Sequence, residues 1–121
     1  MLKTPTAVAL LLTVVLPAFA QTAPQSEIDK DLMEVTIPQL QTFYAAHKYT
    51  VTQVVEWHLA RIHRYNGIYR PVEQILEKEA LATAAQEDAE AAPHGPLWGV
   101  PMVIKANTSI AGQVTTDGWA G

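Results

Sequence analysis

The stretch that decides the fold class is Gly95-Pro96-Leu97-Trp98-Gly99-Val100-Pro101-Met102-Val103-Ile104-Lys105. Its prolines and glycines, together with Pro93, exclude a helix. The apolar run 100–104 is typical of a strand that is buried on both faces, as the strands of parallel sheets are. Lys105 follows directly, at the carboxyl end of this expected strand.

Upstream of this stretch the sequence predicts two helices. Thr36 precedes Gln39 by three residues, a pattern that satisfies free backbone groups at a helix start, and this helix is expected to run to about residue 47. Thr50 and Gln53 repeat the pattern and start a second helix, which is expected to end at Asn66-Gly67. Its apolar residues fall on one stripe at helical spacing: Val51, Val55, Leu59 and Ile62.

Between the second helix and the deciding stretch, residues 71–76 are short and partly apolar, which fits either a strand or a helix, and we predict a strand. Residues 77–92 have high helix propensity and are predicted to form a helix. A strand, a crossover helix and the strand 100–104 would make a right-handed parallel unit. The expected fold class is therefore α/β, with N-terminal helices followed by a strand–helix–strand unit of a sheet that is incomplete in this chain.

Residues 1–20 have the layout of a cleavable secretory signal. Lys3 is followed by the apolar run 7–16, by Pro17 and by the small-x-small triplet 18–20. The run is about half of the roughly 20 apolar residues that a membrane anchor needs. We expect cleavage after Ala20, a linker over 21–30, no membrane segment in the product, and a secreted or periplasmic location.

The composition argues against nucleic acid, disulfides and metal. The chain has 8 Lys and Arg against 12 Asp and Glu, and losing Lys3 with the signal would change the net charge from −4 to −5, which does not attract nucleic acid. Cysteine is absent. We expect no metal and no cofactor, because zinc-helix spacing is missing among the four histidines, His47, His58, His63 and His94.

Lys105 is the only charged residue between Glu90 and Asp117. Ligands of open α/β sheets bind at the carboxyl ends of strands, so a lone lysine there is a candidate for chemistry. To act as a general base its ammonium must lose its proton part of the time, which an apolar surrounding without carboxylates favours. The alternative is that Lys105 only extends into water, its methylenes covering apolar neighbours.

The deciding stretch resembles the start of the amidase signature family. There, a G-P-L-x-G-(I/V)-P run leads into a strand that ends in the catalytic lysine, followed by an A-G and a T-T-x-G, which correspond here to 111–112 and 115–118. The T-I-P-x-L helix from Thr36 and the A-R-I at 60–62 resemble the family's amino-terminal arm. The resemblance covers about residues 31–121, which we expect to be the N-terminal part of an amidase signature domain with its mixed sheet.

The resemblance implies a serine hydrolase that cleaves a carboxamide C–N bond. In that family the lysine takes a proton from a bridging serine, which in turn activates a nucleophilic serine. Lys105 is the triad member present here, and both serines would lie in a glycine- and serine-rich segment beyond residue 121. We expect the chain to be an incomplete amidase that is inactive alone, the whole protein acting on a small-molecule or peptide amide.

Two residues depart from the family pattern. Ala106 stands where an aspartate commonly follows the lysine, so a carboxylate that can orient or pair with the lysine is missing. Trp98 stands where a histidine is common, and it is expected only to repack the turn.

Other candidates have ordinary structural interpretations. Ser109 is expected to be a loop residue because no G-x-S-x-G occurs, and the glycosylation sequon 107–109 is expected to be incidental. Trp57, Tyr65 and Tyr69 can form either a binding patch or, as we expect, the boundary of the core. The alternative function is a small non-enzymatic exported domain, or a degenerate amidase remnant, that binds a partner through an open sheet edge.

Overall fold

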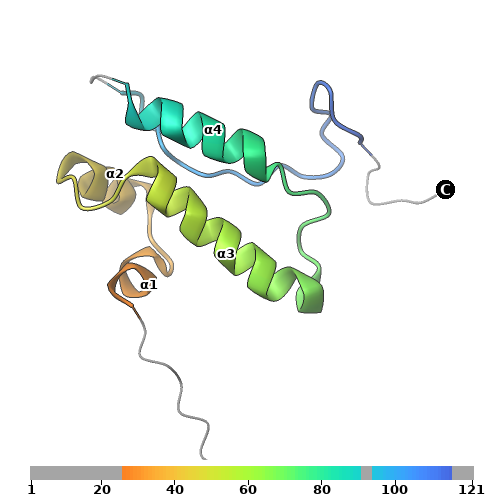
Figure 1. Cartoon of the computed structure of the whole chain (residues 1–121), viewed down its shortest axis with the longest axis horizontal. Helices are drawn as coiled ribbons and strands as arrows, with labels where there is room; N and C mark the ends of the chain where they lie inside the picture. Colours follow the sequence, from red (N-terminus) through yellow and green to blue (C-terminus); the bar gives the residue numbers. More distant parts are fainter. Residues whose placement is uncertain (1–25, 91–93, 116–121) are drawn as a thin grey trace, which may run out of the picture.

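The computed structural model describes residues 26–90 and 94–115, and within these it contains four helices (Figure 1). They are α1 (Glu27–Leu32), α2 (Ile37–Ala45), α3 (Val51–Tyr69) and α4 (Glu77–Asp88). The longest helix, α3, lies alongside α4, and α1 and α2 lie near its N-terminal half. After α4, the chain runs back beside α3 and α4 towards the segment that contains Lys105 (Figure 1).

The starts of three helices are fixed locally by capping boxes. Ser26, Thr36 and Thr50 each accept a hydrogen bond from the backbone N–H three residues later, and the residue at that position accepts one from the cap's own N–H. These contacts satisfy backbone donors that have no partner inside the helix. The predicted starts of α2 and α3 are thereby confirmed, whereas α1 was not expected.

The predicted end of α3 at Asn66-Gly67 is wrong, because the helix continues to Tyr69 and ends at Arg70 in the left-handed conformation (φ 49°). The Asn66 side chain does not terminate the helix. Its Nδ2 donates to the Val72 carbonyl at 2.9 Å, and its Oδ1 accepts from the Val72 N–H at 3.0 Å. The Asn66 side chain thus holds the backbone of Val72 close to the last turn of α3.

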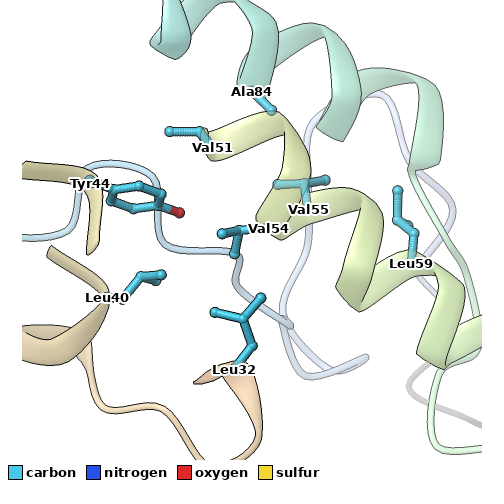
Figure 2. Packing of buried hydrophobic residues seen from close by; sticks show 8 residues of the cluster. All are labelled: Leu32, Leu40, Tyr44, Val51, Val54, Val55, Leu59 and Ala84. Atoms are coloured by element: carbon cyan, nitrogen blue, oxygen red, sulfur yellow. The ribbon is translucent and has the colours of Figure 1, made fainter. Parts of the chain in front are cut away.

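The core lies where the four helices meet (Figure 2). Val54 of α3 is at its centre and is fully buried. Each helix contributes at least one buried apolar side chain, including Leu32 of the unexpected α1. The buried residues are Leu32, Leu40, Tyr44, Val51, Val54, Val55, Leu59 and Ala84.

The expected strand–helix–strand unit is not formed in the part of the chain that the structure describes. Its helix is present as α4, which ends at Asp88 and not at the predicted residue 92, but residues 71–76 and 100–104 have no strand structure. A strand is held by hydrogen bonds to a neighbouring strand, and neither segment has such a neighbour here. Instead of being buried on both faces, the second segment leaves Met102, Val103 and Ile104 exposed, at 72%, 75% and 51%.

The expected signal peptide at 1–20 lies outside the described residues, as do the end of the T-T-x-G word and Pro93. Of the helices described between residues 26 and 115, none is both long and apolar enough to cross a membrane.

Candidate functional site

The segment that leads to Lys105 is held against α2 by two hydrogen bonds to consecutive carbonyls. Gln41 Nε2 donates to the Trp98 carbonyl at 2.7 Å, and the Tyr44 hydroxyl donates to the Gly99 carbonyl at 2.6 Å. The donors are three residues apart and therefore lie on the same side of α2. They join parts of the chain more than fifty residues apart, so a sequence-local pattern could not have indicated them.

Gly99 is required at its position for two reasons. Its φ is +69°, a conformation that glycine adopts without steric cost. A Cβ placed there would lie 2.7 Å from Tyr44 Cε2 and 2.9 Å from Val51 Cγ2, which is closer than carbon atoms approach in proteins. The second glycine of the G-P-L-x-G-(I/V)-P run therefore lets the backbone come close to α2 and α3.

Trp98 is the half-buried side chain of this turn. Its ring meets Tyr44 edge-on, with centroids 5.2 Å apart, and stacks on His94 at 3.9 Å. Its Nε1 is buried and has no hydrogen-bond partner among the residues that the structure describes. Trp98 therefore packs the turn through an aromatic contact with α2 and a stack on His94.

Glu87 lies beside the same turn. Burial, followed by the negative charge of Glu90, raises the pKa of Glu87 above its ordinary value, while a backbone hydrogen bond from Gly99 acts in the opposite direction. The turn is therefore contacted by α4 as well as by α2.

Lys105 itself is exposed. Its carbonyl accepts a hydrogen bond from the Thr108 N–H at 2.9 Å, which closes a turn directly after it. Across residues 26–90 and 94–115, no ion pair or hydrogen bond engages its ammonium, and Ser109 is exposed and not bonded to it. Among the described residues, the backbone around Lys105 is thus held by this local turn, and its side chain is exposed.

The histidines have separate surroundings. His63 Nε2 pairs with Glu77 Oε2 at 2.8 Å and links α3 to α4. Burial, and then the charge of Arg61, lower the pKa of His58. No group of three or more potential metal ligands occurs in the described part of the chain.

The aromatic residues of α3 divide between core boundary and surface. Trp57 is half-buried and donates its Nε1–H to Asp29 Oδ1 at 2.7 Å, which attaches α1 to α3. The Arg61 guanidinium lies over the Trp57 ring at 4.9 Å and the Tyr65 ring at 5.4 Å. Trp57 is thus a boundary residue, as expected, whereas Tyr69 is 74% exposed.

An open pocket lies beside α1, away from the residues that surround Gly99. Its cation, Lys48, pairs with Glu27 at 3.0 Å and with Asp31 at 2.6 Å. The charged groups therefore satisfy one another, and Lys105 is not part of the lining. The lining residues are Ser26, Glu27, Ile28, Lys48, Tyr49 and Gln53.

Comparison with known proteins agrees with the motif. The profile of the family described as Amidase matches residues 53–120, a range that includes Gly99 and Lys105. A putative amidase AmiB2 of Mycobacterium tuberculosis is 42% identical over 74 residues, which are 60% of this chain and 16% of that protein. A putative amidase of Arthroderma benhamiae is 40% identical over 80 residues, 64% of this chain and 13% of that protein.

A glutamyl-tRNA(Gln) amidotransferase subunit of Paenarthrobacter aurescens is also similar, with 31% identity over 100 residues, 77% of this chain and 19% of that protein. No solved structure matches the chain. The chain spans less than a fifth of the length of each of these relatives. Because the profile covers more than half of its residues, the chain belongs to the amidase family and corresponds to an N-terminal portion of it.

Proposed function

We propose that this chain is the N-terminal part of an exported amidase that hydrolyses the carboxamide C–N bond of a small-molecule or peptide amide. Lys105 would be the general base of a Ser–Ser–Lys triad. The observation that carries the proposal is the amidase match across residues 53–120, which contains the lysine directly after the anchored G-P-L-x-G-(I/V)-P run.

The proposed chemistry needs a neutral lysine and two serines. The neutral amine of Lys105 accepts the proton of the bridging serine. The bridging serine in turn takes the proton of the nucleophilic serine, whose oxygen attacks the amide carbon. The leaving ammonia or amine departs with the proton that Lys105 returns through the bridging serine, and water then releases the carboxylic acid from the acyl-enzyme. Of these groups the present chain supplies Lys105, so it would be inactive on its own.

The expected strand 100–104 would form once a neighbouring strand is available. Three observations support this: the segment is apolar, Val100 packs against the core at one end, and residues 102–104 are exposed here. Pairing would cover those side chains and complete the strand–helix–strand unit around α4. Lys105 would then stand at the carboxyl end of a buried strand.

Export distinguishes the proposal from a role in transfer-RNA amidation, which the name of one relative describes. The signal-like residues 1–20 and the net charge of −4 favour an amidase outside the cytoplasm that does not bind nucleic acid. Fusing residues 1–30 to a periplasmically active phosphatase tests this. We expect phosphatase activity outside the cytoplasm and cleavage of about 20 residues from the start of the fusion protein. A phosphatase that stays inside the cell would overturn export.

A chimera tests the chemistry. Residues 31–121 replace the matching segment of the Mycobacterium tuberculosis putative amidase, and ammonia release is measured from a panel of small amides. We expect activity in the chimera, none in the 121-residue chain alone, and a loss of about 10²- to 10⁴-fold on Lys105→Ala. Lys78→Ala, which removes an exposed lysine of α4, is the control that should leave the rate unchanged. A folded Lys105→Ala chimera with full activity would overturn the role of Lys105.

A further inference from the structure

We infer that Tyr44 and Gln41, both on α2, are positioning residues for Lys105. They hold two carbonyls of the turn from which the lysine-bearing segment starts. The inference rests on the proposed function and adds to it a pair of residues far from the deciding stretch in sequence. Neither side chain touches the lysine in the structure; they act through the backbone between Gly99 and Lys105.

Two hydrogen bonds to adjacent carbonyls constrain the turn more strongly than a single hydrogen bond does. A single hydrogen bond sets a distance but lets the turn pivot around it. With Gln41 on the Trp98 carbonyl at 2.7 Å and Tyr44 on the Gly99 carbonyl at 2.6 Å, both the position and the orientation of the intervening peptide are set. Tyr44 is only 7% exposed, so water does not compete for its bond.

The direction in which the chain leaves this anchor is also constrained. Gly99 is in the left-handed conformation, and its backbone is in close contact with Tyr44 and Val51. The next residue, Val100, packs against the core. The segment therefore leaves the helices at one place and in one direction, six residues before Lys105.

Beyond the anchor, the described part of the segment has one other long-range side-chain hydrogen bond, from Gln74 Nε2 to Gln113 Oε1 at 2.8 Å, eight residues after Lys105. Residues 102–105 are exposed, and the turn closed by Lys105 and Thr108 is local. A general base must lie within hydrogen-bond reach of its proton donor, so an error of about 1 Å is costly. The helices can set that position through the turn at residues 98–99, where α2 holds both carbonyls and Glu87 of α4 accepts a hydrogen bond from the Gly99 backbone.

Removing one hydroxyl group tests the inference with a matched control. Tyr44→Phe deletes the bond to Gly99 and keeps the ring. Tyr49→Phe deletes a hydroxyl whose bond to Asp31 has the same 2.6 Å length but leads to α1 instead of the turn. In the chimera defined above, we expect Tyr44→Phe to lower kcat about 10- to 100-fold with little change in KM, and Tyr49→Phe to leave both unchanged.

The result separates positioning from stability and from the proposed function. If Tyr44→Phe keeps full kcat, or if both tyrosine variants lose kcat equally, Tyr44 does not position the lysine. If Lys105→Ala keeps full activity, or if a folded chimera is inactive, the proposed function fails instead.

Hydrogen exchange in the 121-residue chain tests the anchor without activity. The Trp98 and Val100 amides donate to carbonyls within the turn, at 3.1 Å and 3.2 Å. Tyr44→Phe should speed exchange at these two amides about 10-fold while those in the middle of α3 stay protected. Tyr49→Phe should leave the turn unchanged. If these turn amides exchange at the same rate in the unsubstituted chain, in Tyr44→Phe and in Tyr49→Phe, the inference is wrong, independently of any result with the chimera.

Discussion

Asp88, the last residue of α4, caps the start of α3 by accepting a 2.6 Å hydrogen bond on Oδ1 from the backbone N–H of Val51. Its other oxygen accepts from the Thr52 N–H at 3.0 Å and from the Thr52 hydroxyl at 2.6 Å. A carboxylate is unfavourable at the C-terminus of its own helix and favourable at the N-terminus of another. The tertiary contact therefore explains why an aspartate ends α4.

Asp88→Ala should lower the free energy of unfolding by about 1–2 kcal/mol, the cost of losing a helix cap, because three donors of α3 lose their acceptor. Chemical denaturation at neutral pH measures the change. Glu90→Ala, which removes an exposed carboxylate two residues away, is the control and should change stability by less than about 0.5 kcal/mol. Equal effects of the two substitutions would contradict the cap.

The stabilisation by Asp88 should depend on pH. Burial opposes ionisation, but hydrogen bonds from Thr52 and Val51 outweigh it and hold the pKa of Asp88 below 3.8. Because the folded pKa is the lower one, the contribution is complete above about pH 4–5 and is lost as the pH falls through 3.8 and below. The stability difference between the wild type and Asp88→Asn should therefore shrink between about pH 5 and about 2. A difference that stays constant over this range would exclude the ionised carboxylate as the cap.

Three glycine substitutions separate backbone strain from steric overlap. Gly99→Ala should cost about 2–4 kcal/mol, because it adds an unfavourable φ to a clash with Tyr44 and Val51. Gly112→Ala has a similar φ of 78° but meets no described atom within 4 Å, so it should cost only about 1 kcal/mol. Thermal or chemical unfolding of both variants gives the comparison.

The third substitution has the opposite sign. Gly67 lies inside α3, and a Cβ there meets no described atom within 4 Å. Gly67→Ala should therefore stabilise the chain by about 0.5–1 kcal/mol.

If Gly99→Ala were no more costly than Gly112→Ala, the close approach of the turn to α2 and α3 would be wrong.

Helix α1 should prove to be part of the core although it is only six residues long. Leu32 is 2% exposed, and Leu32→Ala should cost about 2–4 kcal/mol through lost apolar burial and a cavity. The neighbouring Met33, at 41% exposure, is the control, and Met33→Ala should cost less than about 0.5 kcal/mol. Similar losses in both variants would mean that α1 does not pack as described.

The features that the sequence predicted well are local ones. The starts of α2 and α3 depend on contacts between Thr36 and Gln39, and between Thr50 and Gln53, each within one turn. The first helix has the same kind of signal, Ser26 with Asp29, but it is short and polar, and its burial depends on Leu32 meeting the other helices.

The features that could not be predicted depend on distant partners. A strand at 100–104 needs a neighbouring strand, and the Tyr44–Gly99 bond joins residues 55 apart. The end of α3 was predicted too early because Asn66-Gly67 is a frequent helix stop, whereas here the Asn66 amide bonds to Val72. Lys105 was predicted from its place after the expected strand and from a family motif, and its role stays a prediction.

The Tyr49 phenol, which donates to Asp31 Oδ2 at 2.6 Å, should titrate late. Burial, and then the hydrogen bond and charge of Asp31, raise the pKa of Tyr49 to about 12. Because the folded pKa is the higher one, the stabilisation by the neutral phenol is complete below about pH 10 and is lost as the pH rises towards about 12. Asp31→Asn removes the charge and should move the pKa of Tyr49 back towards 10. The ultraviolet absorbance of the phenolate measures this, with Tyr49→Phe subtracted in each background, and an unchanged midpoint would show that Asp31 does not control the phenol.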